Sequence, residues 1–388
     1  MDFSGYQNEI YLGGLAGQKP ELPISYADLE ARAKEVLTPE AYGYVAGGAG
    51  SEDTMRQNLE AFRRWRIVPR MLRDISVRDL STEVLGLRMP APVMLAPVGV
   101  LGIVHPDGEV AVARAAASLE IPFILSTAAS RSMEEVAGAA GDGARWFQLY
   151  WPNDEEVAAS FVDRAEKAGY SAIVVTLDVP QLAWRPRDIQ GAFLPFLRGE
   201  GIANYTIDPA FRAQLDESPE ENPTGAVLRW VGVFPHPTLT WERLAWLRER
   251  SSLPVLLKGV LHPKDARKAV KAGMDGIIVS NHGGRQVDGA IAALDALPAV
   301  VEEAGDVPVL LDSGVRTGAD AVKAIALGAR AVLLGRPYAW GLGIAGEEGV
   351  RHVLRSFLAE LDLTMGLSGL TRIAEIDRSV LEPSPATA

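Results

Sequence analysis

Short apolar runs alternate with amphipathic helical stretches from about residue 90 to near the end of the chain. The runs are rich in Val, Ile and Leu and lack an alternation of apolar and polar positions, as expected for parallel strands covered on both faces. They lie at 92–97, 122–127, 145–150, 172–178, 254–259, 276–281, 308–314 and 331–336. Eight strand-helix units predict an α/β fold of the (β/α)8 TIM barrel type over 92–365, with a doubly wound open sheet as the alternative.

Residues typical of helix N-termini and C-termini lie between the apolar runs. Ser132 with Glu135, and Asn153 with Glu156, have the spacing of capping boxes at helix N-termini. Glycines stand where helices should end, at Gly169, Gly273 and Gly328.

Three segments lie outside the repeat, within what we expect to be a single domain over 1–388. Residues 1–91 predict a helical lead-in, because 25–37 and 54–65 have helical periodicity. Residues 188–239 show little periodicity, and because long loops in compact domains are usually lids or mobile segments, we expect an active-site lid there. The short apolar patch WVGVF within it leaves a membrane contact as a minor alternative. Residues 366–388 are expected to form a C-terminal tail.

Composition narrows the classes of protein. A hydrophobic fraction of 48% supplies a sizeable core, and a formal charge of -12 argues against nucleic acid or anionic membrane as a partner. The chain has no cysteine, which excludes disulfides, thiol nucleophiles and thiolate metal sites, and no metal site is expected. The N-terminus lacks the pattern of a secretory signal, and no apolar run approaches the length of a membrane span. We therefore expect a soluble cytoplasmic protein.

Polar residues stand at or just past the C-terminal ends of seven of the eight runs. In a barrel these ends converge on one mouth, where active sites are built, whereas in an open sheet they would be strung along an edge. This distribution favours the barrel. The residues are Ser126, Gln148, Asp178, Lys258, His282, Asp312 and Arg336.

The loops after the last two strands, DSGVRTGAD and LLGRPYAW, each combine small residues with an arginine, Arg316 and Arg336. Glycine lets backbone N–H groups approach an anion, a helix N-terminus adds positive partial charge, and arginine clamps it. Glycine is also routine at such turns, but two successive loops with arginine favour a phosphate site.

Lys258 ends the fifth strand between apolar neighbours, where an unpaired ammonium would be costly. If the phosphate belongs to a flavin, the partner of Lys258 is the electron-rich edge of the ring. The equal alternative is a structural lysine that reaches solvent or pairs with Asp178 or Asp312.

His282 follows the sixth strand in the stretch SNHGGRQVDG, beside Arg285. A lone histidine is more often structural, but at this mouth an imidazole oriented by Asp178 predicts a general base. Arg285 and Arg187 are candidates for a carboxylate clamp. A surface ion pair with Asp188 is the alternative for Arg187 and the favoured interpretation of Arg185.

Two tyrosines, Tyr44 and Tyr150, are candidate hydroxyl donors, although most tyrosines pack. A phosphate end, a flavin-compatible cation, a histidine base and a carboxylate clamp together suggest oxidation of a small hydroxy acid.

The stretches SNHGGRQVDG, APVGVLGIVHPDGE, WFQLYW, VVTLD, LLKG, DSGVRTGAD and LGRPY resemble the FMN-dependent L-2-hydroxy acid oxidoreductase family over nearly the whole chain. The resemblance implies FMN as cofactor, His282 as base with Asp178 as its partner, and Tyr150 at the substrate hydroxyl. It assigns the substrate carboxylate to Arg285, Arg187 and Tyr44. The flavin ligands that it implies are Ala96, Pro97, Val98, Ser126, Gln148, Thr176, Lys258 and Ser280, with the phosphate at Asp312, Gly314, Arg316, Gly335 and Arg336. Family members are usually tetramers or octamers, so a homo-oligomer is expected.

Within the family, YQNEIY, GYVAGGAG, WRPRD, FLPFLRG and GRPYAWG are most similar to the lactate 2-monooxygenase branch, which converts L-lactate and molecular oxygen to acetate, carbon dioxide and water. A lid that slows product release suits that reaction. STAASRS after the second strand and LDVPQLAW after the fourth depart from the bulkier residues of the branch. We expect these smaller residues to admit a side chain longer than that of lactate.

The alternatives are an oxidase that releases the 2-oxo acid and hydrogen peroxide, and a dehydrogenase with another electron acceptor. A different FMN or phosphate barrel enzyme is a further alternative, although a nucleotide dehydrogenase needs a cysteine. A non-catalytic flavin-binding barrel would not need His282 together with two arginines.

Overall fold

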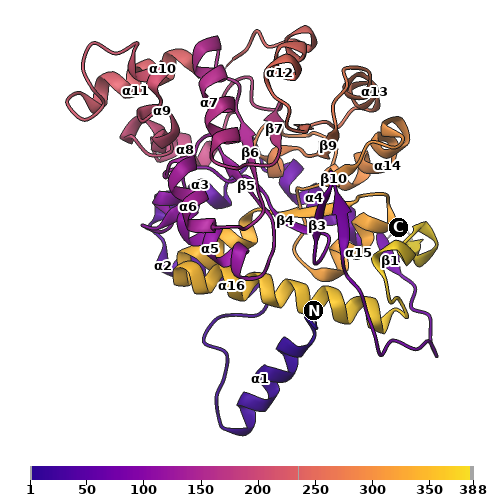
Figure 1. The fold of residues 1–388 in the computed structure, drawn as a ribbon. Helices are drawn as coiled ribbons and strands as arrows, with labels where there is room; N and C mark the ends of the chain where they lie inside the picture. Colours follow the sequence, from indigo (N-terminus) through magenta and orange to yellow (C-terminus); the bar gives the residue numbers. More distant parts are fainter. Residues whose placement is uncertain (1, 235, 385–388) are drawn as a thin grey trace.

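A closed barrel of eight parallel strands forms the centre of the computed structural model, which describes residues 2–234 and 236–384 (Figure 1). Every strand pairs with its neighbours in the repeat, and the last pairs with the first through Val332 and Val93. The predicted (β/α)8 barrel is therefore confirmed, and the open sheet is wrong. The barrel strands are β4 (Val93–Leu95), β5 (Phe123–Ser126), β6 (Arg145–Leu149), β7 (Ile173–Thr176), β8 (Val255–Lys258), β9 (Gly276–Val279), β10 (Val309–Leu311) and β11 (Ala331–Leu334).

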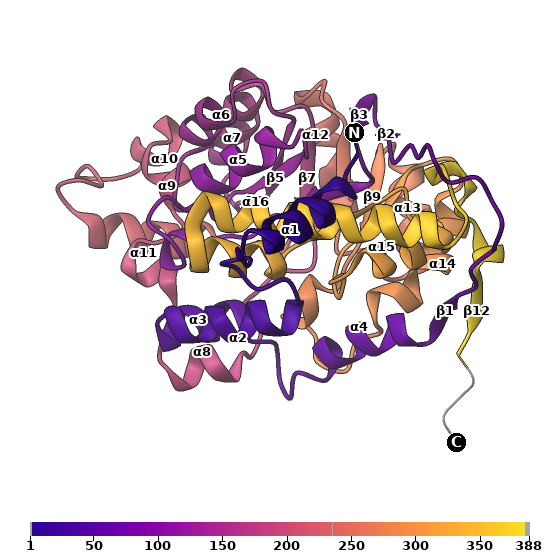
Figure 2. The same ribbon diagram turned by 90° about the horizontal axis from the view of Figure 1, so that it is seen from below.

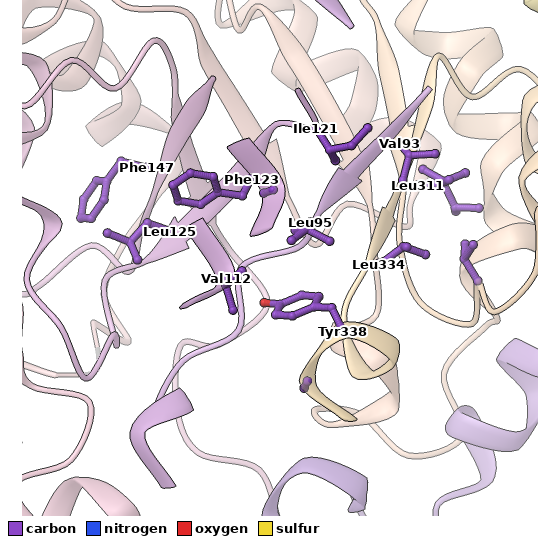
Figure 3. Close-up of a cluster of buried hydrophobic side chains, with 14 of the residues drawn as sticks. Val93, Leu95, Val112, Ile121, Phe123, Leu125, Phe147, Leu311, Leu334 and Tyr338 are labelled. Carbon is purple, nitrogen blue, oxygen red and sulfur yellow. The ribbon is translucent and has the colours of Figure 1, made fainter. Parts of the chain in front are cut away.

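Side chains that alternate along each strand divide the core into two parts. One cluster takes a residue from every barrel strand, which is possible only inside the barrel: Met94, Ile124, Trp146, Val174, Leu256, Ile278, Leu310 and Leu333. The intervening residues, such as Val93, Phe123 and Leu125, point outward and pack against helices (Figure 3). Burial on both faces explains why the strands read as continuous apolar runs.

Helices between the strands form the outer layer. They are α5 (Gly108–Ser118), α6 (Met133–Ala140), α7 (Glu155–Lys167), α12 (Leu244–Arg250), α13 (Pro263–Lys271), α14 (Ala293–Ala304), α15 (Gly318–Ala326) and α16 (Arg336–Leu367). The predicted cap Ser132 accepts the N–H of Glu135. At α7 the prediction is wrong by one residue, because Asp154 and not Asn153 accepts the N–H groups of the first turn. The glycines at 169, 273 and 328 follow helix ends with positive φ, as predicted.

The segment before the barrel is helical only in its first part. It contains α1 (Gly5–Leu15), α2 (Tyr26–Val36), α3 (Pro39–Ala46) and α4 (Asp53–Arg63). Beyond α4 the predicted helical lead-in is wrong: the chain forms β1 (Trp65–Ile67) and a hairpin of β2 (Thr82–Val84) and β3 (Leu87–Met89). Val84 and Met89 of the hairpin pack onto the cluster inside the barrel. β1 pairs with β12 (Leu381–Pro383), so the predicted tail returns to the body (Figure 2).

The segment predicted as an aperiodic lid is folded. It contains α8 (Pro186–Gln190), a 3-10 turn η2 (Pro195–Arg198), α9 (Ala203–Thr206), α10 (Pro209–Arg212), α11 (Pro223–Val233) and η3 (Trp241–Arg243), and we call the described residues of 186–243 the cap. Buried Asn204 joins it to the barrel, donating to the carbonyl of Thr127 at 3.1 Å and accepting the N–H of Met133 at 2.8 Å. Phe196 and Trp230 stack with ring centroids 4.7 Å apart, so the WVGVF patch serves cap packing. Within the described residues, no helix is both long and apolar enough to cross a membrane.

Candidate active site

A cavity opens at the C-terminal ends of the barrel strands and holds about 1130 Å³ of space, including its open mouth. Most of the residues singled out from the sequence line it. These are Tyr44, Ala96, Pro97, Val98, Tyr150, Thr176, Lys258, His282, Arg285, Asp312, Gly314, Arg316, Gly335 and Arg336. Three more, Ser126, Gln148 and Ser280, are buried next to them. The strand-end residues thus converge on one mouth, as the barrel topology requires.

His282, Asp178 and Tyr150 form a hydrogen-bonded line at this mouth. The Nδ1 atom of His282 is 2.9 Å from Oδ1 of Asp178, and its Nε2 atom is 3.4 Å from the hydroxyl of Tyr150. Burial lowers the pKa of His282, although Asp178 acts in the opposite direction. Burial would raise the pKa of Asp178, but the hydrogen bond from His282 and the charge of Lys258 outweigh it and hold that pKa below its usual value. A neutral imidazole therefore faces a carboxylate, which is the arrangement of a general base and its orienting partner.

The loop that carries His282 is held in an unusual backbone conformation. Asn281 caps the turn η4 (His282–Gly284) by accepting the N–H of Gly284 at 3.1 Å. Gly284 has φ +78°, and a Cβ there would lie 2.7 Å from the backbone N of Met55, so only glycine fits. His282 itself has φ 58°, in the left-handed region that residues with a side chain rarely occupy.

The cavity wall carries an excess of positive charge. Five cations line it: Arg185, Lys258, Arg285, Arg316 and Arg336. The carboxylate of Asp312 pairs with Lys258 at 3.0 Å. Of the two aspartates considered as partners for this lysine, Asp312 is therefore the one that it contacts. Burial would lower the pKa of Lys258, but Asp312 and Asp178 raise it above its usual value.

Arg285 and Arg336 have no carboxylate partner among the described residues. Both guanidinium groups donate to backbone carbonyls of the α3 end, including that of Gly47. Burial lowers the pKa of Arg285 to about 10 and that of Arg336 to about 9. Because unpaired buried cations are costly, the cavity is built for anionic ligands.

Three buried donor atoms at the cavity lack a partner within the described part of the chain: Nε2 of Gln148, Oγ1 of Thr176 and Nε of Arg316. Buried donors of this kind are nearly always satisfied in native proteins, so each indicates a ligand atom. Thr176 pairs with Lys258 across β7 and β8, and Gln148 lies on the adjacent strand β6, whereas Arg316 lines the cavity with the glycines of the last two loops. A ligand with a polar ring edge and a phosphate, such as FMN, fits this donor set.

The two arginines of the WRPRD stretch are placed the other way round from the prediction, which put Arg187 in the active site and Arg185 in a surface ion pair. The guanidinium of Arg187 donates to Glu52 at 2.7 Å and does not line the cavity, so its assignment to the substrate carboxylate is wrong. Arg185 lines the cavity instead, buried, with hydrogen bonds to the carbonyl of Arg285 and to Gln286. The predicted ion pairs of either arginine with Asp188 are not among the described contacts.

The apolar part of the cavity was predicted only in part: the two segments STAASRS and LDVPQLAW were expected to shape the room for the substrate side chain, but the phenylalanines of the cap were not singled out. Phe196 and Phe234 of the cap, together with Ala128, Val179 and Leu182, line it beside the substrate-facing polar groups. The phenyl ring of Phe234 packs edge-on against Tyr150, with centroids 5.5 Å apart. The aromatic residues of the WVGVF patch could have indicated it, because large aromatic side chains are usually buried in a core or in the wall of a cavity.

Known proteins share this architecture and sequence. The model of the FMN-dependent dehydrogenase family matches residues 33–383. L-lactate oxidase of Lysinibacillus sphaericus is 46% identical over 94% of this chain and 94% of its own length. Human 2-hydroxyacid oxidase 1 is 44% identical over 93% of this chain and 97% of its own length.

A crystal structure of mandelate oxidase with (S)-4-hydroxymandelic acid superposes with a TM-score of 0.83 at 40% identity, covering 93% of this chain and 99% of that one. The family uses FMN, which the unpartnered donors and buried cations described above accommodate. The chain therefore belongs to the FMN-dependent dehydrogenase family, whose relatives oxidise 2-hydroxy acids.

Proposed function

We propose that this FMN-dependent 2-hydroxy acid oxidoreductase is a lactate 2-monooxygenase, which converts L-lactate and oxygen to acetate, carbon dioxide and water. The observation that carries the proposal is the folded cap, which places Phe196 and Phe234 in the wall of the cavity that contains His282. A packed cap favours retention of the 2-oxo acid after the first oxidation.

The substrate carboxylate is assigned to Arg285 and Arg185, with the hydroxyl of Tyr44 beside them. The guanidinium of Arg285 lies over the ring of Tyr44, 4.8 Å from its centroid, which fixes both groups at the same wall. Arginine suits this role because its planar fork binds carboxylates in a bidentate manner. Arg285 and Arg185 thus bind the carboxylate of the substrate, and Arg316 and Arg336 remain for the phosphate of FMN.

The hydroxyl end of the substrate is assigned to His282 and Tyr150. The neutral Nε2 atom of His282 accepts a proton from the substrate, and Asp178 stabilises the imidazolium that forms. Burial raises the pKa of Tyr150 above its usual value, so the phenol stays protonated and donates a hydrogen bond. Bound FMN supplies the acceptor for the two electrons that leave the substrate.

The remaining steps balance without a further reactant. Two electrons pass from L-lactate through the cofactor to oxygen, which gives pyruvate and hydrogen peroxide. Pyruvate held under the cap then reacts with the peroxide, and cleavage of its C1–C2 bond gives acetate, carbon dioxide and water. Rapid loss of pyruvate would instead give the oxidase outcome.

The test mixes the FMN-loaded enzyme with L-lactate without oxygen and then adds oxygen. We expect the flavin to be reduced in the first step and acetate with carbon dioxide to form in the second. Release of pyruvate and hydrogen peroxide in equal amounts would establish the oxidase instead. Absence of flavin reduction would show that L-lactate is not the substrate.

A second candidate is a 2-hydroxy acid with a longer side chain. Ala128 and Val179 are small residues in the cavity wall, and small side chains there favour a substrate with a longer side chain than the methyl group of lactate. A panel of L-lactate, 2-hydroxybutyrate, 2-hydroxyisocaproate and mandelate tests it. Higher kcat/KM for the longer acids supports this candidate, and equal or better turnover of lactate excludes it.

A further inference from the structure

A second cavity adjoins the first and has no role in the steps described so far. It holds about 1000 Å³ of space, including its open part, between the ends of β7 and β8 and the last turns of the cap. The two cavities share four wall residues: Tyr150, Thr176, Val179 and Phe234. We call it the side chamber.

The shared wall lies next to the reacting groups. The hydroxyl of Tyr150 is 3.4 Å from Nε2 of His282, the proposed base. Thr176 carries one of the unpartnered hydroxyl groups assigned to the flavin. Gly259, which lines the side chamber, packs closely against Asp178. A Cβ added at this glycine would lie only 2.7 Å from the carboxyl carbon of Asp178. A small molecule that crosses the shared wall therefore arrives at the site of oxidation.

The charges of the two cavities differ. Five cations line the first, whereas the side chamber has no lysine or arginine among its described lining residues. Its charged side chain is the carboxylate of Asp265, 3.8 Å from the ammonium of Lys268. Burial and Arg243 lower the pKa of His236, so this imidazole is neutral at pH 7. Lactate, pyruvate and acetate are anions, and a chamber lined by a carboxylate and by no lysine or arginine among its described residues attracts them less than the first cavity does.

The rest of the lining is mixed. Thr240 adds a polar group, and the apolar or aromatic side chains are Trp151, Leu177, Pro180, Leu239, Trp241, Leu244 and Val260. Such a wall imposes no desolvation cost on small neutral molecules. Besides water, the proposed reaction has two such molecules that must enter or leave: oxygen, which must reach the flavin, and carbon dioxide, which must leave. Hydrogen peroxide is also neutral, but it is consumed by the retained pyruvate.

We propose that the side chamber is the passage for oxygen into the active site and for carbon dioxide out of it. The anions are bound in the first cavity under the cap, so gas exchange does not require the 2-oxo acid to be released. The inference rests on oxygen as the electron acceptor in the proposed function. Val260 and Leu239 line the side chamber and not the first cavity. We therefore assign the control of oxygen access to these two residues.

The test fills the chamber and measures the oxidation of reduced flavin by oxygen. Val260→Phe and Leu239→Trp add bulk at a buried wall and at a half-buried rim, respectively. The matched controls are Val231→Phe and Leu228→Trp, at exposed positions of α11. The flavin of each FMN-loaded protein is reduced by light without any substrate, and oxygen is then added in a stopped-flow instrument.

We expect both chamber variants to slow the second-order reaction with oxygen about 10-fold, because a close-packed wall leaves few openings. Both controls should react within about 2-fold of the parent protein, as surface substitutions usually leave function intact. Rates in both chamber variants equal to those of the controls would overturn the inference, as would a parent protein whose reduced flavin does not react with oxygen.

Anaerobic reduction by L-lactate is measured in parallel and should stay within about 2-fold in the chamber variants, because the anion does not use the chamber. Since light reduction needs no substrate, an enzyme that fails to oxidise L-lactate refutes the proposed function alone. Slower reduction by L-lactate with unchanged oxygen reactivity would overturn the inference and assign the chamber to the acid.

Discussion

The imidazole of His282 on the loop after β9 is bound through Nδ1 to the carboxylate of Asp178, which follows β7, at 2.9 Å. The two strands are separated by β8, so the pair forms only when the barrel closes. The contact fixes which ring nitrogen faces the cavity, because Nδ1 donates to Asp178 and leaves Nε2 free to accept a proton.

Replacing Asp178 by Asn should lower kcat/KM by about 10²- to 10⁴-fold, the usual contribution of an oriented general base. His282→Ala should lower it at least as much. Both variants should retain yellow FMN, because the cofactor depends on other residues, and absorbance spectra check this. Normal flavin reduction in His282→Ala would contradict the assignment.

The pH profile of kcat/KM reports on the same histidine. The base must be neutral, and burial lowers its pKa below 6.5, so activity should be constant above about pH 6.5 and fall as the pH drops through the lowered pKa. In Asp178→Asn the residual activity should fall only at a still lower pH, because the carboxylate that stabilises the imidazolium is gone. An inflection that does not move would show that Asp178 and His282 are not coupled.

Arg185 and Arg187 provide a matched pair for the carboxylate site. Arg185→Met should lower kcat/KM for the 2-hydroxy acid by about 10- to 100-fold, since a hydrogen bond to a charged group contributes about 1.5–3 kcal/mol. Arg187→Met should change it by less than about 2-fold, because this guanidinium is bound to Glu52 on the outside. Equal losses in steady-state assays of the two variants would contradict the assignment.

The buried guanidinium of Arg336 predicts selectivity for the phosphate of FMN. Arg336→Met should weaken the binding of FMN to the apoprotein by about 10- to 100-fold and leave riboflavin nearly unaffected, because a charge-assisted hydrogen bond is lost only with the phosphate. Quenching of flavin fluorescence during titration measures both constants. Parallel losses for the two flavins would place the phosphate elsewhere.

Glu109 predicts an effect of pH on stability. Its carboxylate accepts the N–H groups of Leu101 and Ser130, from the loops after β4 and β5, and burial raises its pKa from 4.5 to about 7. The folded protein therefore binds this proton more tightly than the unfolded chain. Its stabilising contribution is complete below pH 4.5 and is lost as the pH rises to about 7.

Glu109→Gln removes this titration. The free energy of unfolding of the variant minus that of the parent should be about 3 kcal/mol larger at pH 8 than at pH 4, because only the parent loses stability as Glu109 ionises. Urea denaturation of the two proteins at both pH values measures the difference. A difference that is the same at both pH values would contradict the prediction.

The cap should determine the products. Phe234→Ala opens the wall beside Tyr150 and should raise the fraction of turnovers that release pyruvate and hydrogen peroxide, because product retention needs a closed site. The exposed Leu228→Ala on α11, the helix that ends just before Phe234, is the control and should leave the product ratio unchanged. Assays of acetate and peroxide after a single turnover give the ratio.

The sequence predicted the barrel because its signals were repeated eight times and each was strong. Continuous apolar runs, helix-ending glycines and polar strand ends all agreed, and their convergence placed His282, Asp178 and Lys258 together. By contrast, the cap contains helices as short as Ala203–Thr206, which span about one turn and have no periodicity to detect.

The exchange of Arg185 and Arg187 shows a different limit. Pro186 begins α8, so Arg187 lies on the helix whereas Arg185 is the extended residue before it, and the two side chains point toward different partners. The direction depends on how α8 packs against α3, which no local pattern encodes. The prediction of Asn153 as the N-cap residue of α7 was wrong because Asn and Asp are equally good N-cap residues, and here Asp154 takes that place.

The left-handed backbone of His282 means that the fold and the reaction favour different residues at one position. A side chain in this conformation costs about 1–2 kcal/mol relative to glycine. His282→Gly would remove this cost, but it would also leave the buried carboxylate of Asp178 without its partner and the reaction without its base. The pair with Asp178 therefore holds in place a backbone conformation that the histidine would not adopt alone, so one contact both orients the base and offsets the strain of the loop that carries it.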